Sequence, residues 1–140
     1  MQNVTANGQP SGAITATSVG DVSLDTVTTD ARISITLADQ IHLNGPVATN
    51  GGELILEATG EIQINAAVTT DGGHLSAKAG QDLTLGAHVS LSTNDGNIVL
   101  QADHNQDRNG NGGALTMQDG SLIDPGSGTI TLAADEHITV

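Results

Sequence analysis

The feature that most constrains this chain is a repeat of about 20 residues that returns six times. Each copy contains a stretch of alternating apolar and polar residues, and the stretches align as GAITATS, ARISITL, GELILEA, GHLSAKA, GNIVLQA and GTITLAA. Their first apolar residues, at intervals of 19, 21, 21, 23 and 32 residues, are Ile14, Ile33, Leu54, Leu75, Ile98 and Ile130. Such a repeat predicts one structural unit that buries its apolar side against its neighbours.

Two more apolar positions recur in each copy. The second position holds Val22 and Leu24, Ile41 and Leu43, Ile62 and Ile64, Leu83 and Leu85, Leu115 and Met117, and Ile138 and Val140. The third holds Val27, Val47, Val68, Val89 and Leu122. Alternation with period two, rich in Thr, Val and Ile, is typical of half-buried β-strands, and no helical spacing is present. Glycine-rich turns fall at a fixed phase, at 50–52, 71–73, 95–96 and 126–128, where a corner needs positive φ.

Two all-β architectures fit these strands: an antiparallel sandwich and a parallel β-solenoid. A sandwich core about 10 Å thick usually contains aromatic residues, and this chain has no Phe, Trp or Tyr. In a solenoid, like residues stack on like, as the small residues Ala58, Ala79, Ala102 and Ala134 do in the alignment. We therefore predict a single-stranded parallel β-helix of about six turns, or rungs, with one rung lengthened by an insertion.

The predicted solenoid covers residues 12–140. Residues 1–11 contain one weak match to the repeat at Val4 and form either an N-terminal stub or a weak cap. The last rung stops in mid-strand at Val140 without a polar cap. A solenoid normally caps its ends. We therefore expect the chain to be a segment of a longer array.

Composition excludes several classes of function. The net charge is −13, and the only basic residues besides histidine are Arg32, Lys78 and Arg108. Nucleic-acid binding needs clustered cations or stacking aromatics, so it is excluded. The absence of cysteine excludes disulfides and thiolate zinc sites. No apolar run approaches the ~18 residues of a membrane span, so we expect no membrane insertion.

The insertion at 103–113 is the candidate metal site. Oxygen-bearing side chains alternate at Asp103, Asn105, Asp107 and Asn109, as in calcium-binding loops. The pattern departs from an EF-hand, because Arg108 replaces the glycine at position six and Ala114 replaces the glutamate at position twelve. Calcium binding and a plain polar surface loop both remain open.

Other polar residues lack the arrangement that chemistry requires. The five histidines fall at different phases of the repeat, so a zinc site is not expected: His42, His74, His88, His104 and His137. The carboxylates Asp21, Glu61 and Asp82 share one corner phase with Gln40, which fits a structural corner better than a catalytic pair. We predict no catalytic residue.

Threonine-rich solenoids also raise the question of ice binding, which needs an unbroken outward ladder of threonines. The outward position between the first two core residues reads Thr15, Ser34, Ile55, Ser76, Val99 and Thr131. The next outward position loses its threonines after two rungs, changing from Thr17 and Thr36 to Glu57 and Lys78. Because both ladders are broken, ice binding is disfavoured.

The runs GEIQINAAVTTDGG (60–73) and AGQDLTLGAHV (79–89) resemble the repeats of filamentous-haemagglutinin-type exoproteins. The resemblance covers roughly residues 12–140. Proteins of this family are large secreted bacterial adhesins, exported by two-partner secretion, with shafts that are right-handed parallel β-helices. The resemblance implies an extracellular or cell-surface location and a structural role, and it supplies no catalytic residues.

We therefore expect a non-enzymatic shaft segment of a secreted or cell-surface bacterial adhesin or filament, acting as a stiff spacer. The alternative is a self-assembling fibre subunit that stacks head to tail through open solenoid ends. A polysaccharide-binding module and an ice-binding protein are less favoured. The expected partners are neighbouring rungs or identical subunits end to end, and a host or matrix surface ligand. No cofactor is required, and calcium is the one ion left open.

Overall fold

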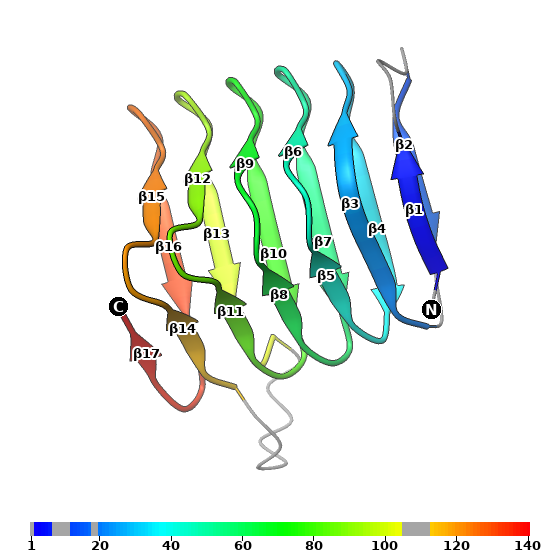
Figure 1. Cartoon of the computed structure of the whole chain (residues 1–140). Coiled ribbons are helices and arrows are strands. Elements are labelled where there is room, and N and C mark those ends of the chain that lie inside the picture. The colour runs from blue at the N-terminus through cyan, green and yellow to red at the C-terminus, as the bar shows by residue number, and fades with distance from the viewer. Residues whose placement is uncertain (1, 7–11, 18–19, 105–112) are drawn as a thin grey trace.

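The structure is a computed structural model that describes residues 2–6, 12–17, 20–104 and 113–140. The chain coils as a parallel β-solenoid of about six rungs (Figure 1). All strand pairs in the described residues are parallel, and none of these residues is helical. The predicted fold class is confirmed, and the antiparallel sandwich is excluded.

The strands form two sheets that give three faces. Face one is the six-stranded sheet, with β2 (Ile14–Thr17), β4 (Ile33–Ala38), β7 (Leu54–Ala58), β10 (Leu75–Ala79), β13 (Ile98–Gln101) and β16 (Ile130–Ala133). Face two contains β1 (Gln2–Ala6), β3 (Val22–Thr28), β5 (Ile41–Leu43), β8 (Ile62–Ile64), β11 (Leu83–Leu85), β14 (Leu115–Met117) and β17 (Ile138–Thr139). Face three contains the end of β3 with β6 (Val47–Ala48), β9 (Val68–Thr69), β12 (Ser90–Ser92) and β15 (Leu122–Asp124).

The first two predicted apolar columns are confirmed. On face one, each first apolar residue pairs with its equivalent in the next rung, from Ile14 with Ile33 through to Ile98 with Ile130. On face two, the second column runs in register from Val22 to Ile138. Because these two columns are in register, the backbone ladder of each rung continues that of the rung before it.

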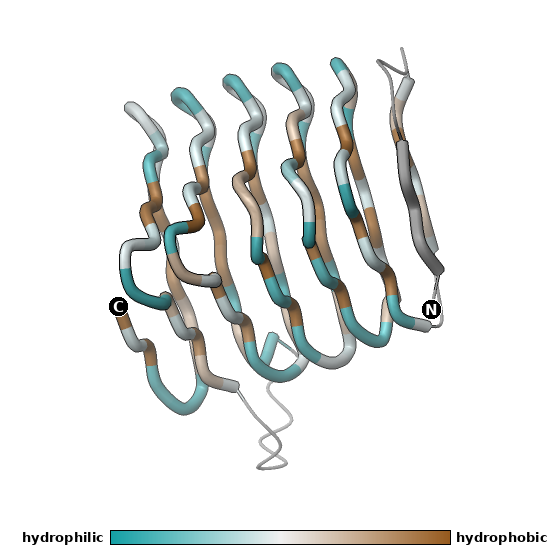
Figure 2. The backbone as a smooth tube through the Cα atoms, viewed as in Figure 1, coloured by the Kyte–Doolittle hydropathy of each residue, from teal (hydrophilic) through white to brown (hydrophobic). Residues whose placement is uncertain are grey.

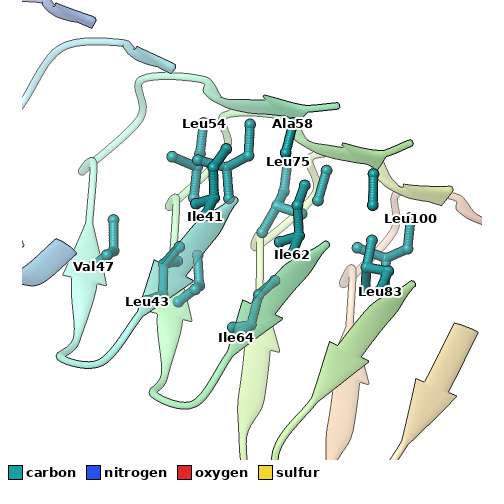
Figure 3. Packing of buried hydrophobic residues seen from close by; sticks show 14 of the residues in the cluster. Ile41, Leu43, Val47, Leu54, Ala58, Ile62, Ile64, Leu75, Leu83 and Leu100 are labelled. Carbon is teal, nitrogen blue, oxygen red and sulfur yellow. The ribbon is translucent and has the colours of Figure 1, made fainter. Parts of the chain in front are cut away.

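The interior is aliphatic and closely packed. Leu54, Ile62 and Leu83, labelled in Figure 3, are fully buried, and Leu54 and Ile62 belong to one rung while Leu83 belongs to the next. Hydrophobic and hydrophilic residues alternate along the strands, and hydrophilic residues gather at the corners (Figure 2). Within the described part of the chain, no buried side-chain nitrogen or oxygen lacks a hydrogen-bond partner. Burial of apolar surface without uncompensated polar groups is what stabilises the coil.

The alanine column contains one more member than the alignment predicts. The sequence alignment places Leu37 opposite Ala58, but the structure pairs Ala38 with Ala58. Leu37 is left over as a β-bulge with φ of 59° and a side chain that is 59% exposed. The reason is space, because at this corner a methyl group stacks on a methyl group and a larger side chain would overpack the column.

The predicted members of the third apolar column are wrong for the last two rungs. Leu91, not Val89, pairs with Val68, and Ile123, not Leu122, pairs with Leu91. Four residues separate Ile64 from Val68, whereas six separate Leu85 from Leu91, so these later rungs contain two extra residues before face three. The extra residues turn outward around His88, whose φ is 59°. Val89 is still buried, whereas Leu122 is 56% exposed.

The N-terminal residues 2–6 add a strand to the coil. β1 pairs in parallel with β3, with Gln2 opposite Val22 and Val4 opposite Leu24. The register shifts between Val4 and Ala6, where Ala6 lies opposite Val27. The stretch around Val4 therefore occupies the rung position before β3.

Candidate functional site

The insertion leaves the coil at a buried acidic residue. Ala102 still donates its N–H to the Ala133 carbonyl, at 2.9 Å, as a rung residue does. Asp103 follows with φ of 49° and a side chain only 5% exposed, and its N–H donates to the Gln81 carbonyl at 3.1 Å. The first predicted calcium ligand thus lies at the edge of the core, not out in the loop.

The chain returns to the coil on the carboxylate of Asp82. One oxygen, Oδ1, accepts the N–H groups of Gly113 at 2.8 Å and Ala114 at 3.0 Å. Hydrogen bonds to a charged acceptor are stronger than neutral ones. Leu115 then stacks on Leu83, so Asp82 sets the register in which the chain re-enters the coil after the insertion.

Further acidic side chains surround Gly113. A Cβ atom placed on this glycine would lie 3.1 Å from Cβ of Asp103, 3.7 Å from Cβ of Asp135 and 3.7 Å from Cγ of Glu136. No three histidine or carboxylate side chains in the described ranges converge closely enough to hold a metal ion. The other predicted ligands, Asn105, Asp107 and Asn109, lie outside the described residues, so calcium binding stays a prediction.

The predicted column of carboxylates is present and is used within the fold. Backbone hydrogen bonds stack Asp21, Gln40, Glu61 and Asp82 at the same corner of successive rungs. Glu61 Oε1 accepts a hydrogen bond from Gln63 Nε2 at 3.3 Å, and Asp82 holds the insertion as described above. Two of the three carboxylates in this column, those of Glu61 and Asp82, thus bind neighbouring groups of the fold.

The histidines lie at separate places. His42 is on face two, where its Nε2 is 3.4 Å from Gln40 Oε1. His74 lies at the corner before β10, and His88 at the bulge before β12. His104 follows the buried Asp103, and His137 is exposed beside β17.

The outward column of face one is in register and is interrupted, as the sequence predicts. Thr15, Ser34, Ile55, Ser76, Val99 and Thr131 pair from rung to rung. The neighbouring outward column carries an ion pair, with Lys78 Nζ 4.0 Å from Glu57 Oε1. Two apolar side chains in the first column, Ile55 and Val99, and a charged pair in the second break the hydroxyl array that ice binding requires.

A column of buried threonines was missed by the sequence analysis. Thr29, Thr49, Thr70 and Thr93 are fully buried at the end of face three, one per rung. The hydroxyls of Thr49, Thr70 and Thr93 each donate to the carbonyl of the glycine three residues later. The signal was present as the recurring strings TNGG, TDGG and TNDG, which place a hydroxyl ahead of each glycine turn.

We define the glycine corner as the turn from face three to face one, at 49–53, 70–74, 93–97 and 125–129. Here side chains of one rung accept backbone N–H groups of the next. His74 Nδ1 accepts from Asn97 at 2.9 Å, and Asn97 Oδ1 accepts from Thr129 at 3.0 Å. Asp95 Oδ1 accepts the backbone N–H of Ser127 at 2.9 Å. This hydrogen bond, and to a smaller extent one from the Ser127 side chain, lowers the pKa of the Asp95 carboxyl. Nothing in the amino-acid sequence singles out these contacts.

No protein-family model matches this chain, and neither curated proteins nor solved structures give a match. The described residues contain no helix that is long and apolar enough to span a membrane.

Proposed function

We propose that the chain is a structural shaft segment of a secreted or cell-surface bacterial adhesin or filament, and that it acts as a stiff, non-catalytic spacer. The observation that carries this proposal is the register of the first apolar column, which is continuous from Ile14 to Ile130. In a β-solenoid each rung is bound only to its immediate neighbours. Here backbone ladders join those neighbours on every face, so bending the shaft would have to deform them. The resemblance of the repeats to filamentous-haemagglutinin-type exoproteins supports the adhesin context.

The absence of catalysis is part of the proposal. Asp82 and Glu61 are engaged in hydrogen bonds that hold the coil together. A general acid or base must instead be free to reach a substrate proton. This arrangement supports a mechanical role over a hydrolytic one.

Stiffness is tested by distance measurements between spin labels. The chain has no cysteine, so Thr15→Cys with Thr131→Cys places two labels on one outward column, five rung steps apart. A spacing of ~4.8 Å per strand puts these Cα atoms about 24 Å apart. We expect a narrow distance distribution, and the pair Ser34→Cys with Thr131→Cys should shorten it by one step. A broad distribution that does not follow the number of rungs would refute the stiff spacer.

Location is tested separately. Antibodies raised against residues 12–140 should label intact bacterial cells or the culture medium of the source organism. Labelling only after permeabilisation would contradict the surface assignment while leaving the stiffness result unaffected. A host or matrix surface ligand is the partner that this location implies.

Head-to-tail assembly is the second candidate, and the exposed last rung favours it. Leu122, Ile130, Ile138 and Val140 expose between 43% and 84% of their surface. Strand topology argues against simple stacking of two copies. If β1 of a second copy covered β17, no described strand of that copy would lie directly on β15 or β16. Electron microscopy of residues 1–140 decides the matter, since filaments support assembly and isolated short particles support the spacer.

Calcium is the ion that we propose for the insertion, with a plain polar loop as the alternative. What supports calcium is the alternation of oxygen-bearing side chains in the sequence, at Asp103, Asn105, Asp107 and Asn109. Calorimetric titration with calcium should release or absorb heat in the wild type, and the heat should fall in Asp103→Asn. No heat at millimolar calcium would leave the plain loop as the explanation.

A further inference from the structure

The glycine corner is closed partly by side chains, and one of them is a histidine. The column just before the face-one strands contains Glu53, His74, Asn97 and Thr129. Their carbonyls accept backbone N–H groups from the preceding rung, as in an ordinary ladder. Two backbone N–H groups of the column are bound by side chains. The N–H of Asn97 donates to His74, and the N–H of Thr129 donates to Asn97. At the corner between β10 and β13, the N–H of Asn97 therefore depends on the acceptor at position 74.

The acceptor on His74 is the ring nitrogen Nδ1, which lies 2.9 Å from the backbone nitrogen of Asn97. Nδ1 accepts a hydrogen bond only when it carries no proton, so the neutral ring has its proton on Nε2. Protonation turns Nδ1 into a donor that faces another donor. The contact is then lost, because two N–H groups do not bond to each other.

We propose that the His74 ring is a proton-sensitive acceptor, which binds the backbone N–H of Asn97 at the glycine corner while the ring is neutral and releases that N–H when the ring is protonated. Histidine is the side chain whose charge ordinarily changes between pH 5 and 8. This proposed role of His74 goes beyond the spacer function and does not depend on it, because it rests only on the fold and on one hydrogen bond.

The next rung supplies a comparison within the same molecule. Asn97 Oδ1 accepts the N–H of Thr129 at 3.0 Å, the role that His74 has toward Asn97. An amide oxygen does not titrate. The variant His74→Asn should therefore keep a bond to the N–H of Asn97 at every pH, and it is the matched control for proton sensitivity.

The experiment must distinguish protonation of His74 from protonation of the other charged groups at the same corner. Glu53 precedes His74 in the column, Asp71 accepts from Asn94 Nδ2, and Asp95 accepts from Ser127. Arg32 occupies the equivalent position one rung before Glu53. Carboxyl groups ordinarily titrate at lower pH than imidazole, and arginine at far higher pH. A window from pH 5.5 to 7.5 therefore isolates imidazole chemistry at this corner.

The experiment follows the amide of Asn97 by NMR from pH 7.5 to 5.5, together with the ring nitrogens of His74. In the wild type we expect the Asn97 amide shift to move with the titration of the ring. We also expect its protection factor against hydrogen exchange to fall roughly three- to tenfold, the factor that one lost hydrogen bond produces. In His74→Asn the shift and the protection factor should stay constant across the window.

Two further variants complete the design. His74→Ala should have low protection at Asn97 already at pH 7.5, because it has no acceptor. His42→Asn removes a histidine on face two and should leave the Asn97 titration unchanged. The proposal is overturned if the ring of His74 titrates while the Asn97 amide does not respond. It is equally overturned if His74→Asn responds to pH as the wild type does.

Discussion

At the scale of single residues, the glycine corner sets the strictest demands. A Cβ on Gly73 would lie 2.0 Å from the Gly52 carbonyl oxygen, and one on Gly96 would lie 2.1 Å from that of Gly73. Glycine stacks on glycine because the backbones of successive rungs approach too closely for any side chain. The buried threonine three residues earlier then closes the turn with its hydroxyl. Two small residues thus fix the path of each rung.

Replacing Thr70 by Val should lower the free energy of unfolding by about 1–2 kcal/mol. The side chain is fully buried, and its hydroxyl donates to the Gly73 carbonyl, which would lose this partner. Thr69 is the matched control, because its side chain is half-buried on the outer surface of β9. Urea unfolding of the two variants measures the difference. Equal losses at both positions would show that the inner hydroxyl adds nothing.

Replacing Gly73 by Ala should cost about 1–3 kcal/mol or more, since the new methyl group must displace backbone atoms of the previous rung. Gly12 is the control, because a Cβ there has no atom within 4 Å. Thermal unfolding followed by circular dichroism compares the two variants. We expect a clear fall in the midpoint for Gly73→Ala and almost none for Gly12→Ala, and the opposite ranking would contradict the tight corner.

Leu37 is the residue whose conformation the fold imposes against local preference. It has φ of 59°, a region that costs a residue with a side chain about 1–2 kcal/mol, and it is 59% exposed. Leu37→Gly should therefore raise stability by about 0.5–1 kcal/mol, despite the loss of a side chain. Chemical denaturation tests this expectation. A destabilised variant would mean that the Leu37 side chain contributes packing that its exposure does not indicate.

At the scale of the elements, each strand works through its alternation of inward and outward residues. Ile62 and Ile64 of β8 face the interior and are fully buried, while Gln63 between them faces outward. The neighbouring β5 and β11 repeat the pattern in register, so the inner column is continuous over three rungs. Because every inner position contacts rungs on both sides, damage at one strand reaches its neighbours.

The alternation of inward and outward residues in β8 is tested by placing the same charge on each of its two surfaces. Ile62→Asp buries a carboxylate without a partner and should unfold the adjacent rungs, a loss of several kcal/mol. Gln63→Asp adds the same group one residue later on the outer surface and should be tolerated. Circular dichroism and limited proteolysis distinguish the two results. Tolerance of aspartate at position 62 would contradict the aliphatic interior.

At the scale of the whole molecule, stability should vary along the axis. A rung in the middle is covered on both sides, whereas β17 pairs only with β14 and its residues are exposed. In a chain of coupled rungs, each rung is stabilised by its immediate neighbours. The central rungs therefore form the most stable part of residues 1–140, and the rung of β16 and β17 the least.

Hydrogen exchange measured by mass spectrometry tests this gradient. We expect peptides from β7, β8, β10 and β11 to be protected longest, and peptides from β16 and β17 to exchange first. Uniform protection along the chain would show that the whole coil unfolds as one unit. It would also exclude independent loosening of single rungs under native conditions.

Much of this architecture was predictable because a solenoid repeats its environment. The residue types at the first and second columns, and at the glycine turns, recur at nearly constant spacing, so alignment alone gave the pairing partners. Prediction failed where the number of residues between two inner positions changed from one rung to the next. At Leu37 and at the segment from Leu85 to Leu91, two apolar residues competed for one inner position, and hydrophobicity alone does not decide between them.

The amino-acid sequence by itself determined the parallel coil, the number of rungs and the aliphatic interior, because these follow from local alternation and from the repeat. Only the tertiary structure decided which side chains bridge one rung to the next. Asp82 binds N–H groups 31 and 32 residues away, and His74 binds one 23 residues away. Such contacts depend on the distance between two backbones that meet only after coiling, and no single rung carries that distance in its own residues.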